Sequence, residues 1–189
     1  MKRKRSVQPS RKMHDIYLIF YEGDSEGEYI NLLKREYKSS IKIKAIKEGT
    51  RLTRSRVSKI TESMKLDSKD DITTFFMYDQ DVPSMNKKLE DIPGVKLLSD
   101  PCFELWYLLH TTSKIRYMTS DECNRKLKLL GDPWSNYEKG DLSNSQEMYL
   151  WNHRKQACLN AHKLKEGKNP SSTIFRLLER LEEEHEKFK

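Results

Sequence analysis

Long apolar runs and paired cysteines are both missing from this chain of 189 residues. Nothing in it approaches the roughly 18 consecutive apolar residues that a membrane-spanning helix needs. The basic start, MKRKRSVQPSRK, is not followed by an apolar stretch long enough for a secretory signal. We therefore expect a cytoplasmic protein with one main domain, since a domain usually takes roughly 150 residues.

Metal-binding patterns built on sulfur or imidazole are absent as well. The three cysteines, Cys102, Cys123 and Cys158, lie far apart and form no CxxC pair. This spacing argues against both a disulfide framework and a thiolate zinc site. The five histidines show neither HxH nor HExxH spacing, so a zinc hydrolase is disfavoured.

Charge is abundant, and its positive excess is concentrated in two segments. The net charge is +7, and residues 1–12 hold six basic residues and no acidic one. Between Lys34 and Lys59, ten basic residues are opposed only by Glu36 and Glu48. Both segments could bind a polyanion through counterion release. The alternatives are a disordered solubilising arm for the first segment and a solvated helix and strand edge for the second.

The first 110 residues alternate between strand and helix patterns. Apolar and β-branched runs predict strands at Ile16–Tyr21, Ile41–Ile46, Ile72–Tyr78 and Val95–Leu98. Amphipathic segments predict a helix capped by Ser25, then helices at Thr53–Lys65 and Cys102–His110. The alternation predicts an α/β fold with a small, mainly parallel sheet flanked by helices on both faces.

After Thr111 the pattern changes, and no further strand is predicted. We expect helices at Ser120–Leu130 and Gln146–Leu164, and a last helix capped by Asn169 with Pro170 at its first position. The chain is thus predicted to comprise a flexible basic arm (1–13), an α/β core (14–111) and a helical C-terminal region (112–189) packed on the core.

Acidic residues follow two of the predicted strands. Glu22 comes just past the first strand, and Asp79 and Asp81 come just past the third. Because ligands bind at the carboxyl ends of strands in an open parallel sheet, we expect these carboxylates to meet at one edge. Three hard oxygen ligands suit Mg²⁺ or Mn²⁺ rather than zinc. The alternative is that these acids are solvated and merely end the strands.

A longer set of motifs resembles the RloB-like family. The set comprises Glu22-Gly23 with Ser25-Glu26 and Tyr29, then Tyr78-Asp79-Gln80-Asp81, and then Asp100-Pro101-Cys102-Phe103-Glu104-Leu105-Trp106-Tyr107-Leu108-Leu109-His110. Tyr137-Glu138-Lys139 and Asn169-Pro170-Ser171-Ser172-Thr173 fit its C-terminal half. The resemblance runs from about Tyr17 to Leu181, and the Pro-Cys-Phe-Glu-Leu-Trp block is its specific part.

This resemblance implies a Toprim-like fold, in which a Glu and an Asp-x-Asp hold Mg²⁺ for phosphodiester chemistry. Glu22, Asp79 and Asp81 match those positions, and Ser25 keeps the hydroxyl of the Thr that family members often carry. RloB-like proteins are commonly encoded beside an ATPase and are implicated in bacterial antiphage or restriction-linked defence. A related arrangement pairs an ATPase with a Toprim nuclease that cleaves tRNA. The resemblance therefore implies a Mg²⁺-dependent nuclease with an ATPase partner, acting on DNA or on RNA, with tRNA among the candidate substrates.

Further side chains are candidates for the same site. Glu22 is either a metal ligand or the general base, and Glu26 could bind a second ion. Glu104 falls among bulky apolar residues, where a carboxylate needs a partner, so it is either a site residue or half of a structural ion pair. His110 could contact phosphate or could be a satisfied core histidine.

A basic cluster marks the start of the second predicted helix. It consists of Arg51, Arg54, Arg56 and Lys59, beside backbone N–H groups that favour phosphate. We expect these residues to contact the nucleic-acid backbone. The alternative function is a non-catalytic nucleic-acid-binding or ATPase-regulating subunit, which would share the basic segments but not need the acids. A topoisomerase-like module is disfavoured, because the chain has no room for a nucleophile domain.

Overall fold

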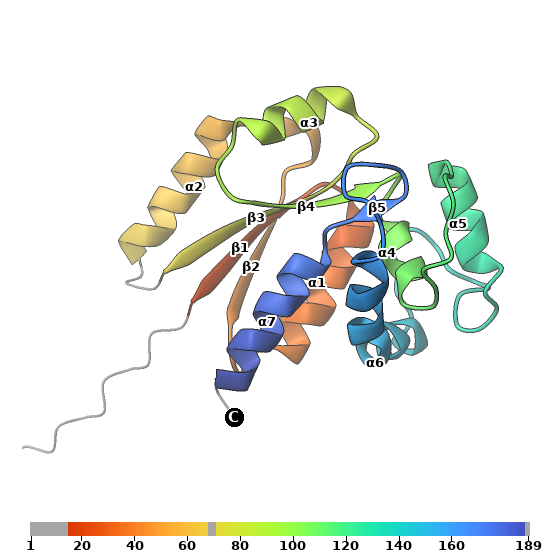
Figure 1. Ribbon diagram of the computed structural model, residues 1–189. Helices are drawn as coiled ribbons and strands as arrows, with labels where there is room; N and C mark the ends of the chain where they lie inside the picture. Colours follow the sequence, from red (N-terminus) through yellow and green to blue (C-terminus); the bar gives the residue numbers. More distant parts are fainter. Residues whose placement is uncertain (1–14, 68–70, 188–189) are drawn as a thin grey trace, which may run out of the picture.

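The computed structural model describes residues 15–67 and 71–187, and the expected basic arm at 1–13 lies outside them. Its centre is a five-stranded sheet in the order β2-β1-β3-β4-β5 (Figure 1). The strands are β1 (Ile16–Tyr21), β2 (Lys42–Lys47), β3 (Ile72–Asp79), β4 (Val95–Asp100) and β5 (Ser171–Ser172). All neighbouring pairs are parallel except β4 with β5. The predicted α/β fold is confirmed.

Helices cover both faces of the sheet (Figure 1). They are α1 (Asp24–Glu36), α2 (Arg54–Asp67), α3 (Pro83–Glu90), α4 (Glu104–Leu109), α5 (Ser120–Lys128), α6 (Asn144–Ala161) and α7 (Phe175–Lys187), with a 3₁₀ turn η1 (Gly49–Arg51). Helices α2 and α3 lie on one face, and α1, α4, α6 and α7 lie on the other. Among the described residues, no helix is long and apolar enough to cross a membrane.

Both faces of β1 are buried, which explains its unbroken apolar run. Tyr17 and Ile19 pack into the core shared with α1 and the C-terminal helices. Leu18 and Phe20 pack into the smaller core under α2 and α3. Since side chains alternate along a strand, a central strand covered on both sides must be apolar throughout.

Two elements were missed by sequence reasoning. Helix α3, with Pro83 near its start, buries only Met85 and Leu89, so its apolar pattern is short. Strand β5 has two serines, Ser171 and Ser172, and is too short to show a period. It forms because Ser171 and Ser172 pair with the end of β4, and the Thr173 side chain accepts a hydrogen bond from Leu98 N at 2.8 Å.

The expected helix cap at Asn169 is wrong. Helix α7 begins at Phe175, after β5. The Asn169 amide donates hydrogen bonds to Asp100 Oδ1 at 2.9 Å and to the Met118 carbonyl at 2.8 Å. Its side chain thus joins the end of β4 to the segment before α5, instead of opening a helix.

Candidate functional site

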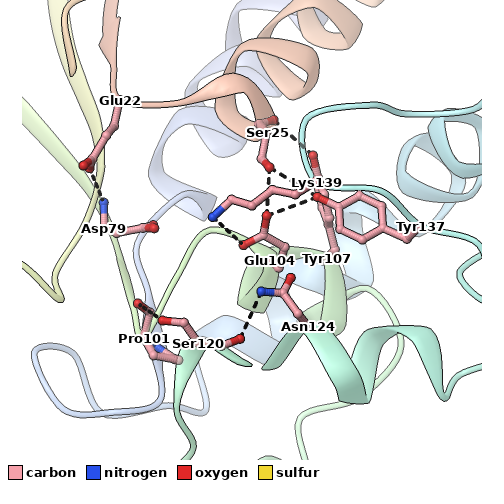
Figure 2. A network of polar contacts seen from close by, with 10 residues as sticks. All are labelled: Glu22, Ser25, Asp79, Pro101, Glu104, Tyr107, Ser120, Asn124, Tyr137 and Lys139. Atoms are coloured by element: carbon pink, nitrogen blue, oxygen red, sulfur yellow. Dashed lines mark hydrogen bonds and ion pairs between the residues drawn. The ribbon is translucent and has the colours of Figure 1, made fainter. Parts of the chain in front are cut away.

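Glu22 and Asp79 lie at the same edge of the sheet, as predicted. β1 and β3 are adjacent and parallel, with Tyr21 opposite Met77, so both strands end together. Asp79 is the last residue of β3, and its backbone N–H donates to Glu22 Oε2 at 3.3 Å. Figure 2 shows this contact between Glu22 and Asp79. The carboxyl ends of the parallel strands therefore bring the two predicted acids into contact.

The turn after β1 places two further side chains in the interior. Helix α1 begins at Asp24 with Gly23 as its N-cap, and no side chain caps it, so the predicted capping role of Ser25 is wrong. Ser25 and Glu26 are buried instead. A Cβ on Gly27 would come within 2.9 Å of the Tyr21 ring, so glycine there lets α1 pack closely on β1.

Glu104 is fully buried and forms the centre of a polar network (Figure 2). Its Oε1 accepts hydrogen bonds from Ser25 Oγ at 2.8 Å and from the Tyr137 hydroxyl at 3.1 Å. The Tyr107 hydroxyl donates to the Ser25 carbonyl at 3.1 Å. Lys139 Nζ lies 3.8 Å from the other oxygen, Oε2. Glu104 therefore has the ion-pair partner of one predicted alternative, and its charge also acts on Glu26 and Asp79, while its role in a functional site stays a prediction.

Four neighbouring acids interact through their charges: Glu22, Glu26, Asp79 and Glu104. The pKa of Asp79 is raised to about 9, mostly by burial and also by the charges of Glu26, Cys102, Glu104 and Glu22. The pKa of Glu26 is raised to about 7, mostly by burial and also by the charges of Glu104 and Glu22. Burial raises the pKa of Glu22, and the charge of Asp81 raises it further. The hydrogen bond from the Asp79 N–H acts in the opposite direction and lowers it. If all four were ionised, the cluster would carry more negative charge than its surroundings compensate, so the raised pKa values keep part of it protonated.

Two oxygens of this cluster are buried without a hydrogen-bond partner, Asp79 Oδ1 and Glu104 Oε2. Carboxylate oxygens left unpaired in this way match the hard donors that Mg²⁺ and Mn²⁺ prefer. Among the residues that the structure describes, however, no three His, Cys, Asp or Glu side chains are arranged to hold a metal ion. The donor chemistry thus fits a divalent ion, while the side chains do not form a closed ligand set.

Comparison with known proteins assigns the chain to a family. The family model of the RloB-like proteins matches residues 17–181. The chain belongs to the RloB-like family. No curated protein matches the chain. Among solved structures, the crystal structure of a variant of Treponema denticola PurE2 covers 82% of this chain and 100% of its own, at 14% identity and a TM-score of 0.35. That likeness is too weak to bear on fold or function.

Asp81, the third predicted acid of this RloB-like protein, lies at the exposed rim of the site. Its charge raises the pKa of Glu22, after burial, and also contributes to the raised pKa of Asp100. Asp100, at the end of β4, was not among the predicted site residues. Its carboxylate also sits at the carboxyl edge of the sheet, where Asn169 holds it.

The basic cluster begins beside Glu22. The N–H of Glu48 donates to the Tyr21 carbonyl at 3.1 Å, and the Tyr78 hydroxyl donates to the Gly49 carbonyl at 3.2 Å. These contacts place η1 and the start of α2 at the carboxyl edge of the sheet. Arg51, Arg54 and Lys59 are exposed there.

Arg56 differs from the other three members of the predicted basic cluster. Its guanidinium donates to both oxygens of Glu48, at 2.7 and 2.8 Å. Glu48 is buried, and the pairing lowers its pKa. Arg56 therefore takes part in a structural ion pair and is less suited to bind phosphate than Arg51 or Arg54.

His110 lies in the core of this RloB-like protein. Its side chain is buried, and Nδ1 lies 2.8 Å from the Trp106 carbonyl. Burial lowers the pKa of His110 to about 3, so the imidazole is neutral. This position does not fit the predicted phosphate contact, because the ring reaches no surface and carries no charge. The core alternative describes its position, but the histidine is only half satisfied, because its buried Nε2 has no hydrogen-bond partner.

Lys139, Tyr137 and Tyr107 are site residues that the spacing of charges and apolar residues did not reveal. Tyr137 and Lys139 come from the loop between α5 and α6, more than thirty residues after Glu104. The signals for them were two motifs of the family resemblance, Tyr137-Glu138-Lys139 and the block from Asp100 to His110 that contains Tyr107. No local pattern could have linked that loop to the turn after β1, because tertiary packing alone brings them together.

Proposed function

We propose that this RloB-like protein is a metal-dependent nuclease that hydrolyses phosphodiester bonds in RNA or DNA. The observation that carries the proposal is the group of Glu22, Glu26, Asp79 and Glu104 at the carboxyl edge of the sheet. Their mutual charge raises the pKa of Asp79 and Glu26, beyond the effect of burial. Groups with such strongly shifted pKa values gather at functional sites more often than elsewhere.

Asp79 and Glu104 are the best-placed metal-binding side chains, because each presents a buried oxygen without a hydrogen-bond partner. Glu22 and Asp81 flank them on the open side of the site. A bound Mg²⁺ or Mn²⁺ would supply charge neutralisation at the phosphate and a more acidic water. Glu22, half-buried beside Asp79, is then either a further ligand or the base that accepts a proton from water.

The Glu104 carboxylate would be held in a fixed orientation by Ser25, Tyr137 and Tyr107. The hydroxyls of Ser25 and Tyr137 both contact Glu104 Oε1, and Tyr107 fixes the backbone of Ser25. These bonds hold one oxygen of Glu104 and leave Oε2 directed toward Lys139 and the acids (Figure 2). Such fixed orientation is what a metal-dependent site needs from the side chains around its ligands.

Substrate would dock along η1 and the start of α2. Arg51 and Arg54 are exposed beside the edge that carries Glu22, so a phosphate backbone bound there would run past the carboxylates. Contacts to phosphate carry no sequence information, so this surface suits either RNA or DNA. We propose tRNA among the RNA substrates, an antiphage defence role and an ATPase partner encoded nearby, all three from the family resemblance.

The test is an incubation of the purified protein with labelled tRNA, other RNA and DNA at several Mg²⁺ and Mn²⁺ concentrations, with and without the neighbouring ATPase. We expect cleavage that requires the divalent ion. Asp79→Asn and Asp81→Ala should each lower the cleavage rate at least about a hundredfold, since each removes a carboxylate that would hold the ion. Asp91→Asn, an exposed position that follows α3, serves as the matched control and should cleave normally.

Two outcomes would contradict the proposal. Full cleavage by both Asp79→Asn and Asp81→Ala would place the chemistry elsewhere in the molecule. Binding of nucleic acid without any cleavage, with the ATPase present and at every metal concentration, would favour the non-catalytic binding or ATPase-regulating function. The non-catalytic function would also agree with the finding that the described residues contain no closed set of metal ligands.

A further inference from the structure

Lys139 is the one cation whose ammonium group lies among the described carboxylates of the site. Figure 2 shows its side chain extending from the 137–141 loop so that Nζ lies between Glu104 and Asp79. The ion-pair distance to Glu104 Oε2 is 3.8 Å, well beyond a direct hydrogen bond. Burial works against the charge of Lys139, but Glu104, Asp79 and Glu26 outweigh it and raise the pKa of Lys139. The ammonium is thus held by several acids rather than bonded to one.

The loop that carries Lys139 is fixed in place by its neighbours. Tyr137 is buried, its ring packs edge-on against Tyr107 at 5.8 Å, and its hydroxyl bonds Glu104. On the other side, Gly140 has φ +80, and a Cβ there would come within 2.6 Å of Asp24 Cβ at the start of α1. The chain on both sides of Lys139 is therefore packed, on one side against Tyr107 and Glu104 and on the other against the start of α1.

Lys139 and Glu104 differ in burial, which a purely structural ion pair would not require. The Lys139 side chain is 61% exposed although its partner Glu104 is fully buried, so the ammonium can leave for solvent without opening the core. Meanwhile Glu104 Oε2 and Asp79 Oδ1, the oxygens nearest to this space, have no hydrogen-bond partner. One positive charge faces at least two unpaired acceptors, which is a weak substitute for a divalent ion.

We propose that Lys139 is a built-in competing cation, which occupies the space between Glu104 and Asp79 in the metal-free protein and is displaced from it when a divalent ion binds. This inference rests on the proposed function, since it concerns the same carboxylates. It adds a control on metal binding: the ion must overcome the repulsion of a tethered ammonium, so the site binds metal less tightly than its carboxylates alone would.

The test is a Mn²⁺ titration of metal-stripped protein by calorimetry, with the Tm in EDTA measured in parallel. We expect Lys139→Gln to bind Mn²⁺ about tenfold more tightly than wild type, because a repelling charge a few ångströms away has been removed. Lys139→Arg, which keeps the charge, should stay near wild type. Lys38→Gln alters an exposed lysine beyond the far end of α1, about 20 Å away, and is the matched control.

The Tm separates this role from a structural one. In EDTA, Lys139→Gln should have a lower Tm than wild type, and Mn²⁺ should raise its Tm by more than it raises that of wild type. A lower Tm with unchanged Mn²⁺ affinity would mean a structural ion pair only and would overturn the inference. If the Gln variant does not fold, Lys139→Met, which keeps the aliphatic stem, replaces it in the same measurements.

Asp79→Asn distinguishes failure of the inference from failure of the proposed function. If Asp79→Asn loses Mn²⁺ binding while Lys139→Gln binds no more tightly than wild type, the metal site stands and the competing cation does not. If neither wild type nor Lys139→Gln binds Mn²⁺, both proposals fail. Binding by Lys139→Gln alone would support the inference most directly, since only the ammonium would then keep the ion out.

Discussion

Asp79 and Glu104 are costly residues for the stability of this protein. Each buries an oxygen without a hydrogen-bond partner, and an unpaired buried acceptor costs about 1–3 kcal/mol. Neither is needed to form its element, since Asp79 merely ends β3 and Glu104 begins α4. Side chains that oppose folding and gather at one sheet edge are better explained by binding or catalysis than by packing.

The stability of the metal-free protein should therefore depend on pH through Asp79. Its pKa is about 9 in the folded protein, against an ordinary value of 3.8, so the folded state holds the proton more strongly. The stability that this proton contributes is fully present below about pH 4 and is lost as the pH rises toward 9. We expect Asp79→Asn to raise the Tm in EDTA by about 2–4 °C at pH 8 and by less at pH 5. Calorimetric scans at both pH values check this, and an equal shift at both would contradict it.

At single positions, the sequence predicted which edge of the sheet a side chain occupies better than how deeply it is buried. Glu22 and Asp79 could be assigned to one edge because both follow strands of a parallel sheet, and the structure joins them. Ser25 was wrongly predicted as a helix cap and His110 was left with two roles, since a hydroxyl at a helix start and a histidine on an apolar helix each have two ordinary uses. Burial decides between those uses, and burial depends on what the C-terminal region covers.

At the scale of elements, the strands with strong patterns were predictable and the weakly patterned ones were not. Strands β1 and β3 are buried on both faces, so their apolar and β-branched runs identify them. Strand β5 is only a pair of serines held by β4, and α3 has two buried side chains. Local sequence carries little information about elements that exist because a neighbour pairs with them.

Helix α2 and the turn before it carry arginines of two kinds, those proposed to bind nucleic acid and one that forms an ion pair within the protein. We expect Arg51→Ala combined with Arg54→Ala to weaken nucleic-acid binding and to reduce the slope of log affinity against log salt by about 0.7–0.9 per arginine, without lowering the Tm. Arg56→Ala should instead lower the Tm by about 2–4 °C, because it leaves the buried Glu48 unpaired, and should change the salt slope less. Filter binding at several salt concentrations and thermal scans test both. Equal salt slopes for the double variant and wild type would remove this surface from substrate binding.

At the scale of the whole molecule, the C-terminal region completes both the core and the site. One apolar cluster contains Tyr17 and Ile19 of the sheet together with residues of α4, α5, α6 and α7. The same region supplies Tyr137 and Lys139 to Glu104. The sequence showed that the region is helical, yet it could not show that the site spans both parts, because that contact is tertiary.

This shared core predicts that residues 1–111 do not form a native domain alone. Without the later helices, Trp106 and Leu109 of α4, both fully buried, would be exposed, and β4 would lose its pairing with β5. Glu104 would also lose its contacts with Tyr137 and Lys139. We expect the fragment to retain far-ultraviolet circular dichroism, lose its near-ultraviolet signal and bind the dye ANS, as compact states without fixed packing do. A cooperative thermal transition and divalent-ion binding in the fragment would show instead that the acidic edge is assembled by the α/β core itself, and that the C-terminal helices only cover it.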